Sequence, residues 1–75
     1  MKKKPYLTKA GVTQYKPVVS MGVLQNIVNE GNKGFCLACG NVSTGVEPDA
    51  RKYTCEKCKA EKVYGFEELI IMGLI

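Results

Sequence analysis

The chain has 75 residues, of which 45% are hydrophobic and 24% are charged, and its formal net charge is +4. This length allows one small domain, which buries too little surface to be stable without disulfide bonds, a metal ion or a partner subunit. No apolar run approaches the roughly 20 residues that span a bilayer, and no apolar stretch follows the N-terminal lysines as in a signal peptide, so we expect a cytoplasmic protein.

The positive charge is concentrated near the N-terminus. Residues 1–29 contain five lysines and no acidic residue, whereas residues 30–75 contain six basic and seven acidic residues. The five are Lys2, Lys3, Lys4, Lys9 and Lys16. Residues 1–17 also contain two prolines, a glycine and no sustained hydrophobic period, which predicts a basic arm that is extended or partly disordered. Such an arm could neutralise the phosphates of a nucleic acid, with Tyr6 and Tyr15 available to stack on bases, but a solvated tail explains the lysines equally well.

A short amphipathic helix and a linker are predicted within residues 18–33. Apolar side chains recur at helical spacing in this segment: Met21, Leu24, Ile27 and Val28. Ser20 is placed to accept a backbone N–H as the N-cap and Gly31 is placed to end the helix, which gives a helix over about residues 20–30. A helix of this length is marginal in isolation, so its apolar stripe must pack on the rest of the chain or on another chain.

Segments with strand character follow in residues 34–75. Two short strands are predicted at residues 41–46 and 51–54, on either side of a Pro-Asp pair that favours a tight turn, and a third at residues 61–64. Together with the helix, these strands predict a small α+β fold with a two- to three-stranded antiparallel sheet.

The C-terminal segment, residues 66–75, is ambiguous between a helix and a strand. Glu67 and Glu68 suit the first turn of a helix and Gly73 suits its C-cap, which favours a short helix. Six of the last seven residues are large and apolar. They either pack against the stripe of the predicted helix, which is the interpretation we favour, or remain exposed as a partner surface or a homodimer interface.

Four cysteines form two tight pairs with fifteen residues between them: Cys36, Cys39, Cys55 and Cys58. This spacing is typical of a zinc site with four thiolate ligands, in which each pair forms a turn that directs both sulfurs at one ion. Gly40 suits the positive φ expected after the first pair, whereas Lys59 suits the matching position less well. Two disulfide bonds, a redox Cys-x-x-Cys and an iron site are alternatives, but a reducing cytoplasm, the short chain and the narrow cysteine spacing favour zinc.

Four thiolates fill the coordination sphere of such an ion and leave no position for an activated water or a substrate. The chain contains no histidine, and its two serines, Ser20 and Ser43, have no neighbouring residue that suggests an activated nucleophile. We therefore expect one structural Zn2+, whose binding supplies much of the folding free energy, and no enzymatic activity.

The segments Phe35-Cys-Leu-Ala-Cys-Gly40 and Tyr53-Thr-Cys-Glu-Lys-Cys-Lys59 resemble the two knuckles of a zinc ribbon. This resemblance covers about residues 34–66 and implies a role in binding nucleic acid or protein, without choosing between them. Residues 47–58 and 63–73 also resemble a family of small zinc-ribbon proteins encoded by bacteriophages and prophages. That second resemblance implies a phage origin and a bacterial cytoplasm rather than an activity.

Two functions follow as expectations. The first is a non-catalytic module that binds nucleic acid, in transcription or genome handling, through the basic arm and through a cluster at the second knuckle: Arg51, Lys52, Lys57 and Lys59. The second is a protein-binding effector whose helix or apolar C-terminal segment docks on a bacterial host protein such as RNA polymerase or a defence nuclease. The aromatic residues near the cysteines are expected to form a small core beside the metal: Phe35, Tyr53, Tyr64 and Phe66.

Overall fold

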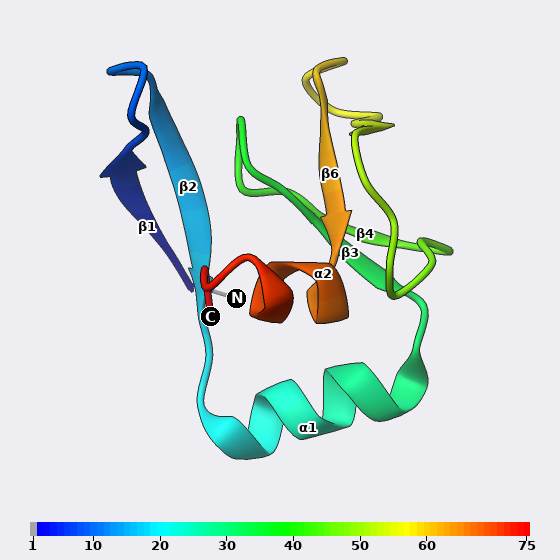
Figure 1. Ribbon diagram of the computed structural model, residues 1–75. Helices are drawn as coiled ribbons and strands as arrows, with labels where there is room; N and C mark the ends of the chain where they lie inside the picture. Colours follow the sequence, from blue (N-terminus) through cyan, green and yellow to red (C-terminus); the bar gives the residue numbers. More distant parts are fainter. Residues whose placement is uncertain (1) are drawn as a thin grey trace.

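A computed structural model of the chain describes residues 2–75 (Figure 1). In chain order its elements are β1 (Lys2–Leu7), β2 (Thr13–Val18), α1 (Met21–Glu30), β3 (Lys33–Cys36), β4 (Val42–Thr44), β5 (Tyr53–Thr54), β6 (Glu61–Gly65) and α2 (Phe66–Ile71). β1 and β2 form a two-stranded antiparallel sheet, and the other strands form a four-stranded antiparallel sheet in the order β4-β3-β6-β5. The fold is therefore small α+β, and none of its helices within residues 2–75 is long and apolar enough to cross a membrane.

The two central strands of the larger sheet, β3 and β6, contribute side chains to both of its faces. Phe35 pairs with Tyr64, and Cys36 pairs with Val63. Because side chains alternate along a strand, the first pair faces one side of the sheet and the second pair faces the other. The sheet thus separates an aromatic core from the cysteines, whereas we expected the aromatic residues beside the metal. Tyr53, expected in that core, lies on an edge strand and is 41% exposed.

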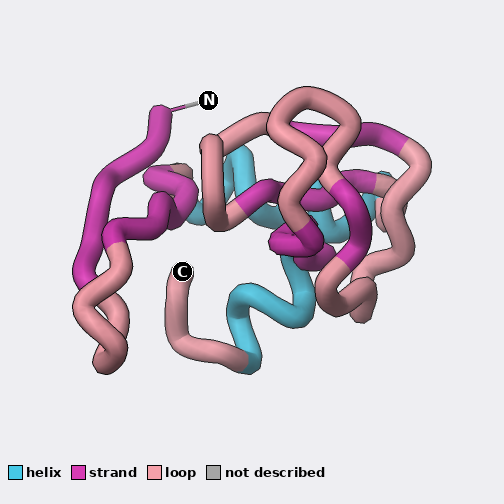
Figure 2. The backbone as a smooth tube through the Cα atoms, turned by 90° about the horizontal axis from the view of Figure 1, so that it is seen from above, coloured by secondary structure: helices cyan, strands magenta, loops and turns pink. Residues whose placement is uncertain are grey.

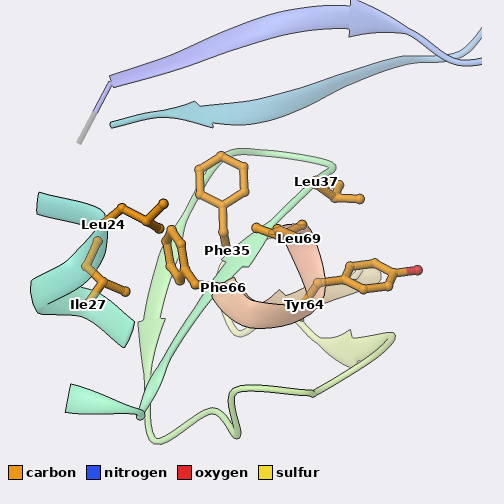
Figure 3. Close-up of a cluster of buried hydrophobic side chains, with 7 residues drawn as sticks. All are labelled: Leu24, Ile27, Phe35, Leu37, Tyr64, Phe66 and Leu69. Carbon is orange, nitrogen blue, oxygen red and sulfur yellow. The ribbon is translucent and has the colours of Figure 1, made fainter. Parts of the chain in front are cut away.

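Both helices and the hairpin of β1 and β2 cover the aromatic face of the sheet (Figures 1 and 2). The rings of Phe35 and Phe66 meet edge to face, with centroids 6.3 Å apart. Leu24 and Ile27 of α1 and Leu69 of α2 pack in the same cluster (Figure 3). Fully burying one side chain of this size contributes about 1.5–3 kcal/mol, so this cluster is what holds the helices on the sheet.

The helix α1 has the caps expected from its sequence. The Ser20 Oγ accepts a hydrogen bond from the Val23 N–H at 3.3 Å, and Gly31 ends the helix with a φ of 73°. Its apolar stripe is divided, because Leu24 is buried in the core whereas Met21 is 80% exposed. The stripe thus meets the core with its middle residues and leaves the first turn in solvent.

The C-terminal segment is helical over α2 and ends in a Schellman motif. Gly73 has a φ of 77°, and the Leu74 N–H donates to the Leu69 carbonyl at 3.0 Å. Leu69 is fully buried and Leu74 packs against the aromatic core, whereas Ile71 is 75% exposed and Met72 is also exposed. One side of this apolar segment therefore packs in the core together with α1, as the favoured interpretation predicted, and the other side is exposed. Its use as a partner surface or homodimer interface stays a prediction.

Residues 45–52 cross a face of the sheet. The expected tight turn is present at residues 47–50, where the Ala50 N–H donates to the Glu47 carbonyl at 3.0 Å, but it does not join two paired strands. β4 pairs with β3, and β5 pairs with β6, so the predicted hairpin of residues 41–46 and 51–54 is wrong. β3 was not predicted as a strand. It lies with β6 between the two edge strands, which gives four strands in place of two or three.

Two glycines, opposite each other in register, make this crossing feasible: Gly34 of β3 and Gly65 of β6. A Cβ at Gly34 would overlap the Val46 side chain, and a Cβ at Gly65 would overlap the Pro48 carbonyl. The Gly65 N–H also donates to the Ala50 carbonyl at 3.0 Å. The crossing segment, residues 45–52, therefore satisfies its backbone groups against the sheet, which removes the need for β4 and β5 to pair with each other.

The described part of the predicted arm, residues 2–17, is extended but belongs to a regular hairpin. β1 and β2 pair along their whole lengths. The turn between them is closed by the Gly11 N–H, which donates to the Thr8 carbonyl at 2.9 Å, and Gly11 has the positive φ of 78° that a glycine adopts without strain.

The two prolines of this hairpin lie where the ladder does not need their missing N–H groups. Pro5 pairs with Tyr15, and the Tyr15 N–H donates away from β1 to the Leu37 carbonyl at 2.8 Å. This pair and the pair of Pro17 with Lys3 are thus non-hydrogen-bonded pairs, in which a proline removes no ladder bond. The two prolines, from which we predicted an irregular arm, are therefore compatible with paired strands.

Candidate metal centre and basic hairpin

The first knuckle, residues 35–40, follows directly from β3. The Cys36 N–H donates to the Asn41 carbonyl at 2.9 Å, and the Gly40 N–H donates to the Cys36 carbonyl at 2.8 Å. Gly40 has a φ of 78°, in agreement with the positive value expected at this position. The chain therefore reverses tightly around Cys36 and Cys39.

The second knuckle, residues 53–59, repeats the same hydrogen bonds. The Cys55 N–H donates to the Ala60 carbonyl at 2.8 Å, and the Lys59 N–H donates to the Cys55 carbonyl at 2.9 Å. Lys59 has a φ of 66°, although it is not a glycine. A left-handed conformation costs a residue with a Cβ roughly 1–2 kcal/mol, so the second knuckle carries strain that the first avoids.

The two knuckles bring the four thiols to one place. The four sulfur atoms lie within 4.8 Å of one another, and the cysteines are free. The Sγ atoms of Cys36 and Cys58 are 3.6 Å apart, and those of Cys39 and Cys55 are 3.7 Å apart. A tetrahedral ion with sulfur ligands at about 2.3 Å has sulfur–sulfur edges of about 3.8 Å, whereas a disulfide bond needs about 2.05 Å. The cluster could therefore hold one metal ion.

The thiols of this cluster differ in their electrostatic surroundings. Burial raises the pKa of Cys36 to about 12 and also raises the pKa of Cys39. The pKa of Cys55 is lowered to about 6, chiefly because the Cys58 backbone N–H, 3.5 Å from the Cys55 Sγ, stabilises the thiolate. A divalent cation among the sulfurs would favour the thiolate at every position, so binding would release protons from the thiols that burial keeps neutral.

The hairpin is fastened to the first knuckle by a lysine side chain and a backbone bond. The Lys3 Nζ donates to the Cys39 carbonyl at 2.7 Å and lies 4.5 Å from the centroid of the Tyr15 ring. The Lys3 side chain also covers Gly40, where a Cβ would overlap it. Together with the Tyr15 N–H bond to Leu37, these contacts place the hairpin directly beside the metal centre. Lys3, predicted to bind nucleic acid, is therefore engaged within the protein.

The other face of the hairpin collects the remaining strand lysines. Residues paired across an antiparallel ladder share a face, and Lys4 pairs with Lys16, while Lys2 lies two residues from Lys4 on the same strand. Tyr6 and Gln14 continue this face toward the turn, and the Tyr6 hydroxyl donates to the Gln14 Oε1 at 2.8 Å. Burial raises the pKa of Tyr6. Val18, the partner of Lys2, completes this face. We call it the outward face, and its six residues carry three positive charges.

The basic residues at the second knuckle do not join the outward face. The Arg51 Nε lies 2.7 Å from the Glu68 Oε1, and Glu68 is buried, so Arg51 balances a carboxylate in the protein. Lys52, Lys57 and Lys59 are exposed. In Figure 1 this knuckle lies on the opposite side of the first knuckle from the hairpin. Lys9 is exposed in the hairpin turn, beyond the end of β1.

An exposed apolar surface lies beside the aromatic core, at the junction of α1 and α2. A groove between the two helices is lined by apolar side chains that include Leu24, Val28 and Ile70. Met21 at the start of α1 and Ile71 on α2 are exposed. The helical spacing of apolar residues in α1 predicted an apolar stripe. How the stripe divides between core and solvent depends on where α2 lies, which the sequence does not reveal.

No protein-family model matches the chain, and neither a curated protein nor a solved structure is significantly similar to it. The likeness to zinc ribbons therefore stands on the spacing of the cysteines and on the two equivalent knuckles.

Proposed function

We propose that the protein is a non-catalytic nucleic-acid-binding module built around one structural zinc ion. The observation that carries the proposal is the outward face of the hairpin, on which Lys2, Lys4 and Lys16 gather in a segment without acidic residues. Lysines that neutralise phosphates release counterions, which drives association with a nucleic acid. Their support on a paired strand lowers the conformational entropy lost on binding, compared with lysines on a disordered arm.

The proposed role of zinc follows from the ligand set. Four sulfur atoms within 4.8 Å of one another suit zinc, which takes four thiolates in structural sites. The closed ligand set leaves no open position on the ion, which supports a structural role and argues against catalysis. Native mass spectrometry of freshly purified protein tests this assignment, because it should show one zinc ion per chain. Iron or an apo chain with a retained fold would contradict it.

Nucleic-acid binding is tested by fluorescence anisotropy with random-sequence 30-mers, both as single strands and as duplexes. The variant Lys4→Gln/Lys16→Gln should bind at least about tenfold more weakly at low salt, because two phosphate contacts are lost. Lys57→Gln/Lys59→Gln removes the same charge at the second knuckle and is the matched control, for which we expect a small loss. Equal losses in both variants would show that net charge alone drives binding, and no binding by the parent protein would refute the proposal.

The exposed apolar surface of α1 and α2 favours one other function, a protein-binding effector. Met21 and Ile71 expose 80% and 75% of their surface, and Met21 also lines the groove between the two helices, so apolar groups are available to a partner there. The resemblance to phage-encoded zinc ribbons suggests a bacterial cytoplasm and a host protein, such as RNA polymerase or a defence nuclease, as its setting. A complex held by this surface should resist both nuclease and high salt, and should be lost in Met21→Gln/Ile71→Gln. A complex held by the hairpin should show the opposite pattern.

A further inference from the structure

We propose that the nucleic acid is double-stranded DNA and that the hairpin of β1 and β2 enters its major groove with the outward face toward the base pairs and phosphates. This inference rests on the proposed nucleic-acid-binding function and adds to it the class of ligand. It is carried by three features of the hairpin: its attachment, its free surfaces and the state of its aromatic residue.

The hairpin is attached to the first knuckle through one edge and one face. The outer edge of β2 bonds the first knuckle through the Tyr15 N–H, and the face that carries Lys3 rests on Gly40. On the outward face Lys2 and Lys4 are exposed and can meet a ligand, whereas Tyr6, Gln14 and Lys16 are half-buried. Two paired strands of six residues form a ribbon about 20 Å long. The major groove of B-form DNA, about 12 Å wide, admits a two-stranded ribbon of this kind.

Tyr6, the aromatic residue on the outward face, already makes contacts within the hairpin. Proteins that grip single strands stack bases on open aromatic rings. The Tyr6 hydroxyl is bonded to Gln14, and the Lys16 Nζ lies over the Tyr6 ring, 6.0 Å from its centroid. The exposed ring of Tyr53 lies on β5, where Glu47 raises its pKa and would repel a phosphate backbone. Within residues 2–75, the lysine-bearing face thus offers charge without an open stacking platform, which favours a duplex over a single strand.

The free edge of β1 is poorly suited to a protein strand. Pro5 lies at the centre of this edge and lacks the N–H that strand addition would use. The same edge carries a net positive charge from consecutive lysines at positions 2–4. The free edge of β1 therefore disfavours pairing with a strand of another protein, and its positive charge favours contact with phosphates.

The test compares three ligands of one sequence with the full, metal-loaded chain: a 20-base-pair DNA duplex, its single strand, and the corresponding RNA duplex. The deep and narrow major groove of A-form RNA excludes side chains, so it should also exclude the ribbon. We expect the DNA duplex to bind at least tenfold more tightly than either other ligand. With three or four phosphates neutralised, log K should fall with log salt at a slope of about −3.

Two further measurements locate the contact on the protein and on the DNA. The variant Lys4→Gln/Lys16→Gln should reduce the salt slope by about 2, while Lys57→Gln/Lys59→Gln should leave it nearly unchanged. A dye that binds the major groove should compete with the protein, and a minor-groove ligand should not. Equal binding to the single strand or to the RNA duplex would overturn the duplex-groove inference and leave the proposed function standing. Failure to bind all three ligands would overturn both.

Discussion

The two knuckles share one backbone geometry but differ in what surrounds them. In each, the cysteine N–H donates to a carbonyl five residues later, and a residue with positive φ closes the turn. The first knuckle is continuous with a central strand, contains a glycine at the strained position and is covered by the hairpin. The second knuckle follows a two-residue edge strand, contains Lys59 at that position and exposes Cys58. The difference indicates that the protein body supports the first knuckle, whereas the second knuckle would depend more on a bound ion.

The largest expected effect comes from removing the metal. Zinc binding contributes on the order of 10 kcal/mol in small zinc peptides, which is comparable to the whole stability of a small domain. Adding a chelator should therefore abolish the amide hydrogen-exchange protection of β3 and β6, measured by NMR, and readdition of zinc should restore it. Protection should disappear first at the second knuckle during a chelator titration. A protected sheet in the metal-free chain would contradict the dependence of both knuckles on the ion.

The next largest effect is expected at the ion pair between Arg51, which precedes the second knuckle, and Glu68 of α2. Arg51→Met should destabilise the protein by about 2 kcal/mol, because the buried Glu68 carboxylate would lose its charged partner. Chemical denaturation of the zinc-loaded protein measures this change. Lys52→Met removes the same charge from a neighbouring exposed residue and should cost less than about 0.5 kcal/mol. Equal effects of the two substitutions would mean that the ion pair does not stabilise the fold.

A smaller effect is expected at the turn of the first knuckle. Gly40→Ala should destabilise the zinc-loaded protein by roughly 1–2 kcal/mol, because alanine disfavours positive φ and its Cβ displaces the Lys3 side chain. Thermal unfolding gives the stability change. The displaced lysine should also loosen the hairpin, visible as faster exchange of the Tyr15 amide. Gly11→Ala strains a turn with open space around it and so controls for φ without the contact with Lys3.

The smallest effect is a stabilisation at the matching position of the second knuckle. Lys59→Gly should raise the free energy of unfolding by up to about 1 kcal/mol, because glycine relieves the positive φ while its larger unfolded-state entropy offsets part of the gain. The same denaturation experiment detects it. Lys57→Gly, within the same knuckle but without a positive φ, should instead destabilise. A loss of stability in Lys59→Gly would show that the lysine side chain contributes contacts that outweigh the strain.

Local signals in the sequence were sufficient for the helices and for the metal cluster. Ser20 and Gly31 delimit α1, Gly73 ends α2, and the paired cysteines meet as their spacing predicts. The helix caps depend on residues within a few positions of one another. The cysteine cluster depends on four thiols that can bind one ion only if the two pairs meet. The positive φ at Gly40 was predictable for the same reason, because no other residue fits that turn as easily.

Features that depend on distant partners were missed or misassigned. The hairpin carries lysines and prolines where alternation of apolar residues is usual, and its order depends on contacts such as that of Lys3 with Cys39. A usable signal was present nonetheless, since Pro5 and Pro17 both fall at non-hydrogen-bonded positions around the turn at Gly11. The pairing of β4 and β5 was misassigned because the glycines that admit the crossing segment lie outside it, at Gly34 and Gly65.

The register of the central strands has a consequence for how quickly the chain folds. Phe35 pairs with Tyr64, so the first contact between β3 and β6 must close a loop of 64 − 35 = 29 residues. Closing such a loop costs about 3 kcal/mol of free energy, from lost chain entropy, before any native contact forms. The hairpin of β1 and β2 closes a much shorter loop, within microseconds. An ion caught between Cys36 or Cys39 and the second pair would shorten this search, because it holds the ends of both strands together. We therefore expect zinc to act as the nucleus of folding, with refolding rates that rise with metal concentration.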